Sequence, residues 1–308
     1  MSFSYGTQAH IVKDSISPEG KRLTTMKVTF HRFVLAELNT HRKFSRNSAS
    51  SRAIPFETML RRAMEHPAIP FEWPREQPGM SGGAELEGED KWDAEDTLFA
   101  IRDYTTRILT EYIERHPDKS TRLHKSLLNR PLEWFMWHTA IISSTEWENF
   151  FAQRISKSAQ PEIHALALVM KTALDDSRPD EIPFGGWHLP FVDMETPEAE
   201  NLEEAIKIST ARCARVSYLT HDDIRDASED IRMYDETLWA NGHWSPMEHP
   251  ALCLPTTRFK AVYANFSHGW AQHRYFAEND MNSVAKEITE WYLAKDGTDN
   301  ILGLRPQD

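Results

Sequence analysis

Two hydrophobic spacings occur along the chain, and together they limit what it can fold into. In TTMKVTFHRF, residues 24–33, Met26, Val28 and Phe30 occupy every second position, which predicts a strand with one buried face. In DAEDTLFAIRDYTTRILTEYIERH, residues 93–116, the apolar residues recur at helical intervals, which predicts a helix. A chain that carries both patterns is predicted to contain both strands and helices.

The same patterns predict the other elements. Residues 75–90 are rich in Gly, Pro and acidic residues and are predicted to form a mobile loop or lid. A strand is predicted in residues 249–259. Helical regions are predicted in residues 34–42, 130–154, 159–174, 199–218, 228–242 and 281–295.

The length of 308 residues lies between one large domain and two smaller ones. Residues 177–200 are rich in Pro and turn-forming residues and are the predicted internal boundary. The division predicted is an N-terminal half of residues 1–176, a linker of residues 177–200 and a C-terminal half of residues 201–308. The two halves are expected to form one compact catalytic unit.

Composition excludes several classes of function. The formal net charge of −12 disfavours nonspecific binding of nucleic acid, although one local pocket can still hold a small anion. The chain has no run of eighteen apolar residues and no leader-like start, so we expect a cytoplasmic protein that is not in the membrane. Cys213 and Cys253 are too few for a disulfide framework or a zinc ribbon, and no metal site is predicted.

A basic, serine-rich segment, NTHRKFSRNSASSR at residues 39–52, stands out in this acidic chain. Serine hydroxyls and backbone N–H groups beside Arg42 and Arg52 could cradle a phosphate. The alternative is a solvated basic turn. From His41 to Arg52 the order is H-R-x-x-S-x-N-x-x-S-x-R. This order resembles the signature of the flavin-dependent thymidylate synthases, which is usually written R-H-R-x-x-S, with Thr40 here at the first Arg.

A second block, in residues 149–163, is similar to that family's N-F-x-x-x-R followed by A-Q-x-E-I. Asn149 and Arg154 lie about one and a half helical turns apart, so they could serve neighbouring parts of one ligand. The alternative for Arg154 is a surface cation on a helix. Arg130, just before Pro131, looks like the family's arginine for the nucleotide phosphate.

A third block completes the resemblance. ARVS at residues 214–217 and GHWSPMEH at residues 242–249 are similar to the family's A-R-V-S and G-H-x-x-P-x-E-H segments. These segments normally precede the H-R-x-x-S block and here follow it, so the chain resembles a circularly permuted relative. Trp270, His273 and Arg274 could form a pterin or flavin wall, but an aromatic core is the favoured interpretation.

The resemblance implies a homotetramer with the fold of that family, which is mixed α/β (α+β) with a mixed sheet and long helices, here with the chain permuted. It implies conversion of dUMP to dTMP, with FAD as cofactor, methylenetetrahydrofolate as one-carbon donor and NADPH as reductant. The implied catalytic residues are Arg154, Arg42 and His243. The implied substrate-binding residues are Glu37, Ser50, Ser51, Arg52, Arg130 and Arg154. The residues implied to bind the flavin are His41, Arg42, Asn149, Ser217, His243, Ser245 and Glu248.

Three departures leave alternatives open. Glu37 stands where the family commonly has Gln, and Ser48 where it commonly has Glu. A change of hydrogen-bonding groups there could select another base, so a flavin- and folate-dependent dCMP or dUMP methylase or hydroxymethylase is the first alternative. Thr40 in place of Arg makes a flavin- or nucleotide-binding protein without turnover the second.

Overall fold

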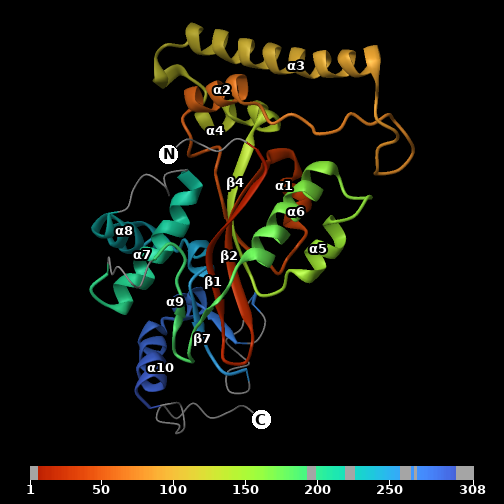
Figure 1. The fold of residues 1–308 in the computed structure, drawn as a ribbon. Coiled ribbons are helices and arrows are strands. Elements are labelled where there is room, and N and C mark those ends of the chain that lie inside the picture. Colours follow the sequence, from red (N-terminus) through yellow and green to blue (C-terminus); the bar gives the residue numbers. More distant parts are fainter. Residues whose placement is uncertain (1–5, 193–198, 219–225, 257–264, 267–268, 296–308) are drawn as a thin grey trace.

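The fold contains two sheets (Figure 1). The computed structural model describes residues 6–192, 199–218, 226–256, 265–266 and 269–295. The first sheet has five strands in the order β3-β4-β2-β1-β5, and the second has three in the order β6-β7-β8. Helices accompany both sheets, so the predicted mixed α/β class is confirmed.

The first sheet is built on a long hairpin. Strands β1 (Gln8–Ile16) and β2 (Arg22–His31) pair antiparallel, and β2 contains the predicted alternating stretch. Strand β4 (Trp137–Ser144) lies between β2 and β3 (Ser45–Ser48), and both pairings are antiparallel. Strand β5 (Asp180–Glu181) adds a short parallel edge to β1.

Helix α6 (Pro161–Asp176) covers one face of this sheet against β1 and β2. Met26, Val28 and Phe30 are fully buried there with Ile163 and Leu166, which makes this face the largest core of the molecule. Two shorter helices lie at the end of the same layer, α1 (Leu35–Asn39) and α5 (Glu148–Arg154) (Figure 1). The core therefore holds in place the two helices that flank the basic segment.

The prediction of one helical region over residues 130–154 is wrong in its middle. The chain forms a 3-10 helix η3 (Arg130–Phe135), then strand β4, and then helix α5. The run Ala140–Ile141–Ile142 is buried, and β4 is paired on both edges. A strand buried on both faces loses its alternation, and its short apolar run cannot be distinguished from a helix by period.

A separate layer extends beyond the sheet. Helix α3 (Gly88–Arg115) lies across α2 (Phe56–Glu65), α4 (Lys125–Leu128) and η3, with a 3-10 turn η2 (Lys119–Thr121) between α3 and α4 (Figure 1). Helix α3 begins five residues earlier than predicted, so the end of the predicted lid, from Gly88, is helical. The rest of that loop is joined to the chain before it by a bridge between Pro74 and Glu85, and its mobility stays a prediction.

The C-terminal half packs helices around the small sheet of β6 (Trp187–His188), β7 (Ala251–Cys253) and β8 (Trp270–Gln272). The predicted helices are confirmed. Of the strand predicted over residues 249–259, Ala251–Cys253 forms β7, residues 254–256 are not a strand, and residues 257–259 lie outside the described residues. Within the described ranges, no helix has the length and apolarity needed to cross a bilayer. The helical elements are α7 (Leu202–Arg215), η4 (Val216–Tyr218), α8 (Ala227–Met233), η5 (Tyr234–Trp239), η6 (Ser245–Glu248), α9 (His273–Glu278) and α10 (Asn282–Lys295).

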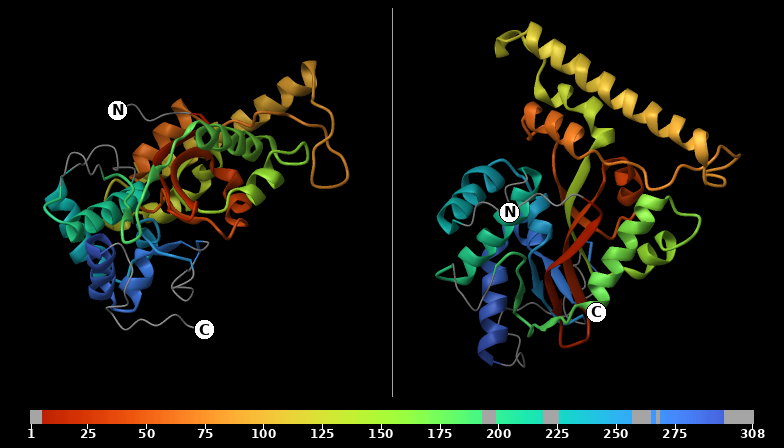
Figure 2. Two further views of the ribbon diagram at one scale, coloured as in Figure 1. Left: turned by 60° about the horizontal axis from the view of Figure 1, so that its bottom comes forward. Right: turned by 45° about the horizontal axis from the view of Figure 1, so that its top comes forward.

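The predicted boundary, residues 177–200, supplies β5 to the first sheet and β6 to the second. At the junction, buried side chains form one chain of hydrogen bonds, each 2.6–2.8 Å long, through Ser15, His188, Thr25, Ser143 and His249. Burial lowers the pKa of His249 to about 3, so its ring is neutral. The halves therefore share a buried polar contact. Away from this junction, α3 and α10 lie at opposite ends of the molecule (Figure 2).

Candidate functional site

The basic segment, defined here as residues 39–54, runs from the end of α1 through β3 to the start of α2. Its first contact is with the second sequence block. Arg154 Nε donates to His41 Nε2 at 2.9 Å, and Arg154 Nη2 donates to Thr40 Oγ1 at 3.1 Å and to the Glu37 carbonyl at 3.2 Å. Arg154 is thus held on the segment although 113 residues separate it from His41.

His41 is a neutral acceptor at this contact. Burial, together with the nearby charges of Arg154 and Arg46, lowers its pKa to about 4. Because Nε2 accepts from Arg154, the ring proton lies on Nδ1. The ring also packs edge-on against Phe150, with centroids 4.9 Å apart. The imidazole therefore orients the guanidinium without repelling it.

Strand β3 then contacts the third block at η6. Gln272 Nε2 donates to Ser45 Oγ at 2.7 Å and to the Glu248 carbonyl at 2.9 Å, so one amide joins the two blocks. The Glu248 carboxylate accepts from Arg274 Nη1 at 2.5 Å and from Asn265 Nδ2 at 3.4 Å. Glu248 is thus a buried carboxylate with fixed partners beside Ser45.

The end of the segment is held by backbone contacts. Ser50 N donates to the Ser217 carbonyl at 3.0 Å, which brings the A-R-V-S block to the segment through its main chain. Asn129 Nδ2 donates to the carbonyls of Ser51 at 2.6 Å and Ile54 at 3.0 Å. The segment therefore contacts every block that the sequence pattern singled out.

The predicted site residues fall into two groups. In the first group, hydrogen bonds within the described residues join Arg154 to His41 and Glu37. Another hydrogen bond joins Ser50 to Ser217, and the contacts of Glu248 bring it beside β3. Arg130 forms an ion pair with Glu133 at 3.0 Å, and half of its side chain is exposed. The predicted residues exposed on the surface are Arg42, Arg52, Arg130, Asn149, His243 and Ser245.

Three residues that sequence reasoning did not assign to the site hold its parts together. These are Asn129, Asn265 and Gln272. The need of Gln272 for hydrogen-bond partners follows from its burial in the folded chain, which the sequence alone does not show. Trp270 is fully buried, so the core interpretation of that stretch is confirmed for this residue. Arg274 contacts Glu248 instead of the core.

Three buried acceptor atoms on residues that hydrogen-bond to the segment lack a partner among the described residues. They are Glu37 Oε2, Asn129 Oδ1 and Gln272 Oε1. A buried acceptor without a donor is costly, so these positions suit a ligand or water that donates to them. With exposed Arg42 and Arg52 on the same segment, the region offers cations for an anionic group and acceptors for a ring or amide.

No family model matches the chain, and no curated protein matches it. Two solved structures of the UMP/dUMP methylase PolB from Streptomyces cacaoi are similar to part of it. The structure bound with 5-Br UMP has 14% identity and a TM-score of 0.41, and covers 56% of this chain and 89% of its own. The structure bound with 5-Br dUMP has 13% identity and a TM-score of 0.40, with 56% and 92% covered.

Proposed function

We propose that the chain is an FAD-dependent methylase that converts dUMP to dTMP, with methylenetetrahydrofolate as carbon donor and NADPH as reductant. The proposal rests on the resemblance of the three blocks to the flavin-dependent thymidylate synthases. The observation that carries it is the convergence of these blocks, which are far apart in sequence, on the basic segment at residues 39–54. Convergence is expected of one ligand site and is not required of unrelated surface motifs.

The residues present fit a flavin with a diphosphate. Arg42 is exposed on the segment, and the neutral His41 and the Glu248 carboxylate lie within the same set of contacts. In the proposal, Arg42 and His243 bind the phosphates, while the cofactor ring lies near Asn149, Ser217, Ser245 and Glu248. When bound, reduced FAD supplies the hydride for the pyrimidine product.

The nucleotide phosphate is assigned to Arg52, Arg130 and the hydroxyls of Ser50 and Ser51. Asn129 already holds the Ser51 carbonyl, so the serine turn is fixed before a ligand arrives. Arg130 would exchange its exposed ion pair with Glu133 for the phosphate. An exposed ion pair stabilises little, so the exchange costs less than about 1 kcal/mol.

Arg154 is the proposed catalytic cation. Its Nε and one terminal nitrogen are used by His41, Thr40 and Glu37, and in the described part of the chain its other terminal nitrogen, Nη1, makes no hydrogen bond. That nitrogen can donate to a pyrimidine carbonyl, where negative charge develops as the ring is reduced. The two held nitrogens keep the planar guanidinium oriented, which a lysine could not reproduce.

The departure at Thr40 is accounted for by Arg154. The Thr40 hydroxyl accepts a hydrogen bond from Arg154 Nη2 at 3.1 Å, so Thr40 helps to hold the guanidinium in its position. The substitution is therefore compatible with turnover.

One observation favours a second candidate, a dCMP methylase or hydroxymethylase. Glu37 Oε2 is buried and has no donor among the described residues. A carboxylate only accepts, whereas the family's Gln can also donate. Cytosine offers an exocyclic amine as donor where uracil offers a carbonyl, so Glu37 suits cytosine better.

We also propose a homotetramer, as the resemblance implies. Helix α3 supports association, because it carries exposed apolar side chains along one stripe, with Ile101 54%, Tyr104 60% and Ile108 37% exposed. These positions have the spacing of a helix seam that pairs with a second helix. The double variant Ile101→Glu with Tyr104→Glu should lower the mass measured by light scattering, and an unchanged mass would place the interface elsewhere.

The decisive experiment supplies purified protein with FAD, NADPH, methylenetetrahydrofolate and either dUMP or dCMP. Mass spectrometry then distinguishes a methylated from a hydroxymethylated product on each base. The double variant Arg42→Ala with His243→Ala should stay folded and lose its flavin absorbance. No product from either nucleotide with flavin bound would indicate a binding protein without turnover, and full flavin occupancy in the double variant would refute the assignment of the cofactor site.

A further inference from the structure

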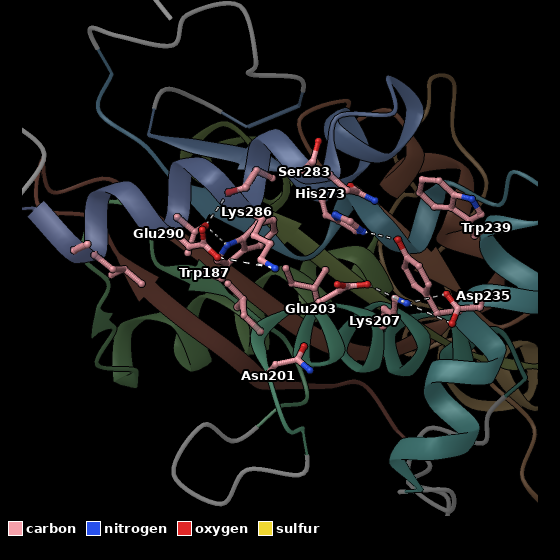
Figure 3. Close-up of a pocket in the computed structure, with 18 residues that line it drawn as sticks. Trp187, Asn201, Glu203, Lys207, Asp235, Trp239, His273, Ser283, Lys286 and Glu290 are labelled. Atoms are coloured by element: carbon pink, nitrogen blue, oxygen red, sulfur yellow. Dashed lines mark hydrogen bonds and ion pairs between the residues drawn. The ribbon is translucent and has the colours of Figure 1, made fainter. Parts of the chain in front are cut away.

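A second concave site lies in the C-terminal half, away from the basic segment. A cavity of about 1280 Å³ opens between α7, η5 and α10 (Figure 3). Small-molecule sites usually have volumes of about 300–1,000 Å³, so the cavity can hold a ring system with water around it. His273 lines the cavity, while Arg274 next to it in sequence contacts Glu248, so α9 separates the cavity from the proposed catalytic site.

Three polar side chains meet inside the cavity. Tyr234 Oη and His273 Nε2 are 2.8 Å apart and buried. Asn282 lines the same cavity. Tyr234 Oη has no other hydrogen-bond acceptor among the described residues, so its hydroxyl proton is donated to His273 Nε2.

This arrangement fixes which atoms remain for a ligand. Burial lowers the pKa of His273 to about 3, so the ring is neutral and carries one proton. Since Nε2 accepts from Tyr234, the proton lies on Nδ1, which has no partner among the described residues. Asn282 Oδ1 likewise has no partner there. His273, whose side chain is 96% buried, thus offers an unpaired donor, and Asn282 offers an unpaired acceptor.

The walls and mouth of the cavity define the rest of the ligand. Trp187, Tyr234 and Trp239 provide aromatic surface, which suits a flat ring. At the mouth, Lys207 pairs with Glu203 at 3.3 Å and Asp235 at 3.1 Å, and Lys286 pairs with Glu290 at 4.0 Å (Figure 3). Each lysine already has a carboxylate partner, so the mouth does not select an anion.

We propose that this cavity binds a neutral, planar heterocycle with a lactam edge, in which a ring carbonyl stands beside a ring N–H. The carbonyl accepts from His273 Nδ1–H, and the N–H donates to Asn282 Oδ1. The ring body lies among the three aromatic side chains. Binding satisfies both buried atoms at once, which an aromatic hydrocarbon of the same shape cannot do.

The test uses the full chain and carbostyril, a bicyclic lactam, as probe, with titration calorimetry as the measurement. N-methylcarbostyril has the same shape without the N–H donor. We expect saturable binding of carbostyril and about tenfold weaker binding of the N-methyl compound, which is the effect of one buried hydrogen bond left unmade. In Asn282→Leu the two probes should bind equally, because the acceptor is gone.

Two controls locate the effect. Ser283→Ala, at the neighbouring mouth residue, and Arg42→Ala, in the basic segment, should both keep the tenfold difference. Asn282→Asp should also keep the tenfold difference, because an acceptor oxygen remains. This variant serves as the measurement if Asn282→Leu does not fold. No saturable binding, equal affinity of the two probes for the unaltered protein, or loss of the difference in Ser283→Ala would overturn the proposal.

Discussion

The basic segment and the C-terminal cavity are both polar sites, but they are held in opposite ways. On the segment, the cations Arg42 and Arg52 are exposed, and its fixed contacts run largely through backbone carbonyls and through Arg154. In the cavity, His273 and Asn282 are enclosed by aromatic side chains of the same half. An exposed cationic site is completed by its ligand or by another subunit, whereas an enclosed site is complete in one chain.

The difference in exposure also changes how much the loss of a contact lowers the free energy of unfolding. Charge on the segment is screened by solvent, so its residues can be exchanged with little effect on the free energy of unfolding. Polar groups in the C-terminal half are desolvated, and each lost partner costs more. Variants of the segment should therefore change activity, and variants of the C-terminal half should change stability.

The largest effect is expected at Arg154. Arg154→Ala should keep the fold and the flavin but lose about 10²- to 10³-fold in turnover, because one charge-stabilising donor is removed from the transition state. Arg154→Lys should recover little, since a point charge does not replace the planar fork. Product formation under saturating nucleotide is the measurement.

Arg115→Ala is the matched control, because Arg115 is an exposed arginine in the last turn of α3. It should leave turnover unchanged. If the turnover of Arg154→Ala is close to that of the unaltered protein, Arg154 is a structural cation. The expectation that variants of the segment change activity would then be wrong.

The sequence predicted the segment better than it predicted the cavity. The motif spacing singled out His41, Arg154 and Glu248 because reactive and charged residues recur in fixed short patterns. Asn282 and Tyr234 line one cavity only because the fold brings α10 and η5 to it, and residues 48 positions apart leave no local pattern. The strand β4 was missed for a related reason, because burial on both faces removes the alternation that identifies a strand.

The largest effect on stability is expected at Asp230. Its carboxylate is fully buried and accepts from Arg212 Nε at 2.9 Å and from Arg215 Nε at 2.6 Å. Asp230→Ala leaves two buried guanidinium groups without this partner and should lower the free energy of unfolding by about 3–5 kcal/mol. Denaturant titration measures this loss in the free energy of unfolding.

Asp235→Ala is the control, since the Asp235 side chain is 49% exposed in its pair with Lys207. It should cost less than about 1 kcal/mol. Equal costs at Asp230 and Asp235 would show that burial does not set the cost of losing an ion-pair partner in the C-terminal half.

A smaller effect is expected from pH. The pKa values of His41, at about 4, and of His249 and His273, at about 3, are lowered chiefly by burial. The unfolded chain binds these protons near pH 6.5 and the folded chain does not, so stability falls as pH falls from 7 to 5. His41→Gln and His273→Gln should each reduce the slope of the free energy of unfolding against pH by the contribution of about one proton. Denaturant titrations at several pH values measure this slope. Equal stability at pH 7 and pH 5 would be inconsistent with buried neutral rings in either region.

The smallest effect is expected at Glu37, where the buried carboxylate oxygen has no donor among the described residues. Glu37→Gln preserves the shape and the Glu37 carbonyl that accepts from Arg154, but it adds a donor. A cytosine amine loses an acceptor in this variant, whereas a uracil carbonyl gains a donor. The ratio of kcat/KM for dUMP to that for dCMP should rise about tenfold, which corresponds to one hydrogen bond exchanged.

Glu57→Gln is the control, because Glu57 is an exposed carboxylate on α2, and it should leave the ratio unchanged. If Glu37→Gln changes kcat/KM for both nucleotides by the same factor, Glu37 positions Arg154 and does not face the base, and the segment then selects its substrate through the phosphate alone.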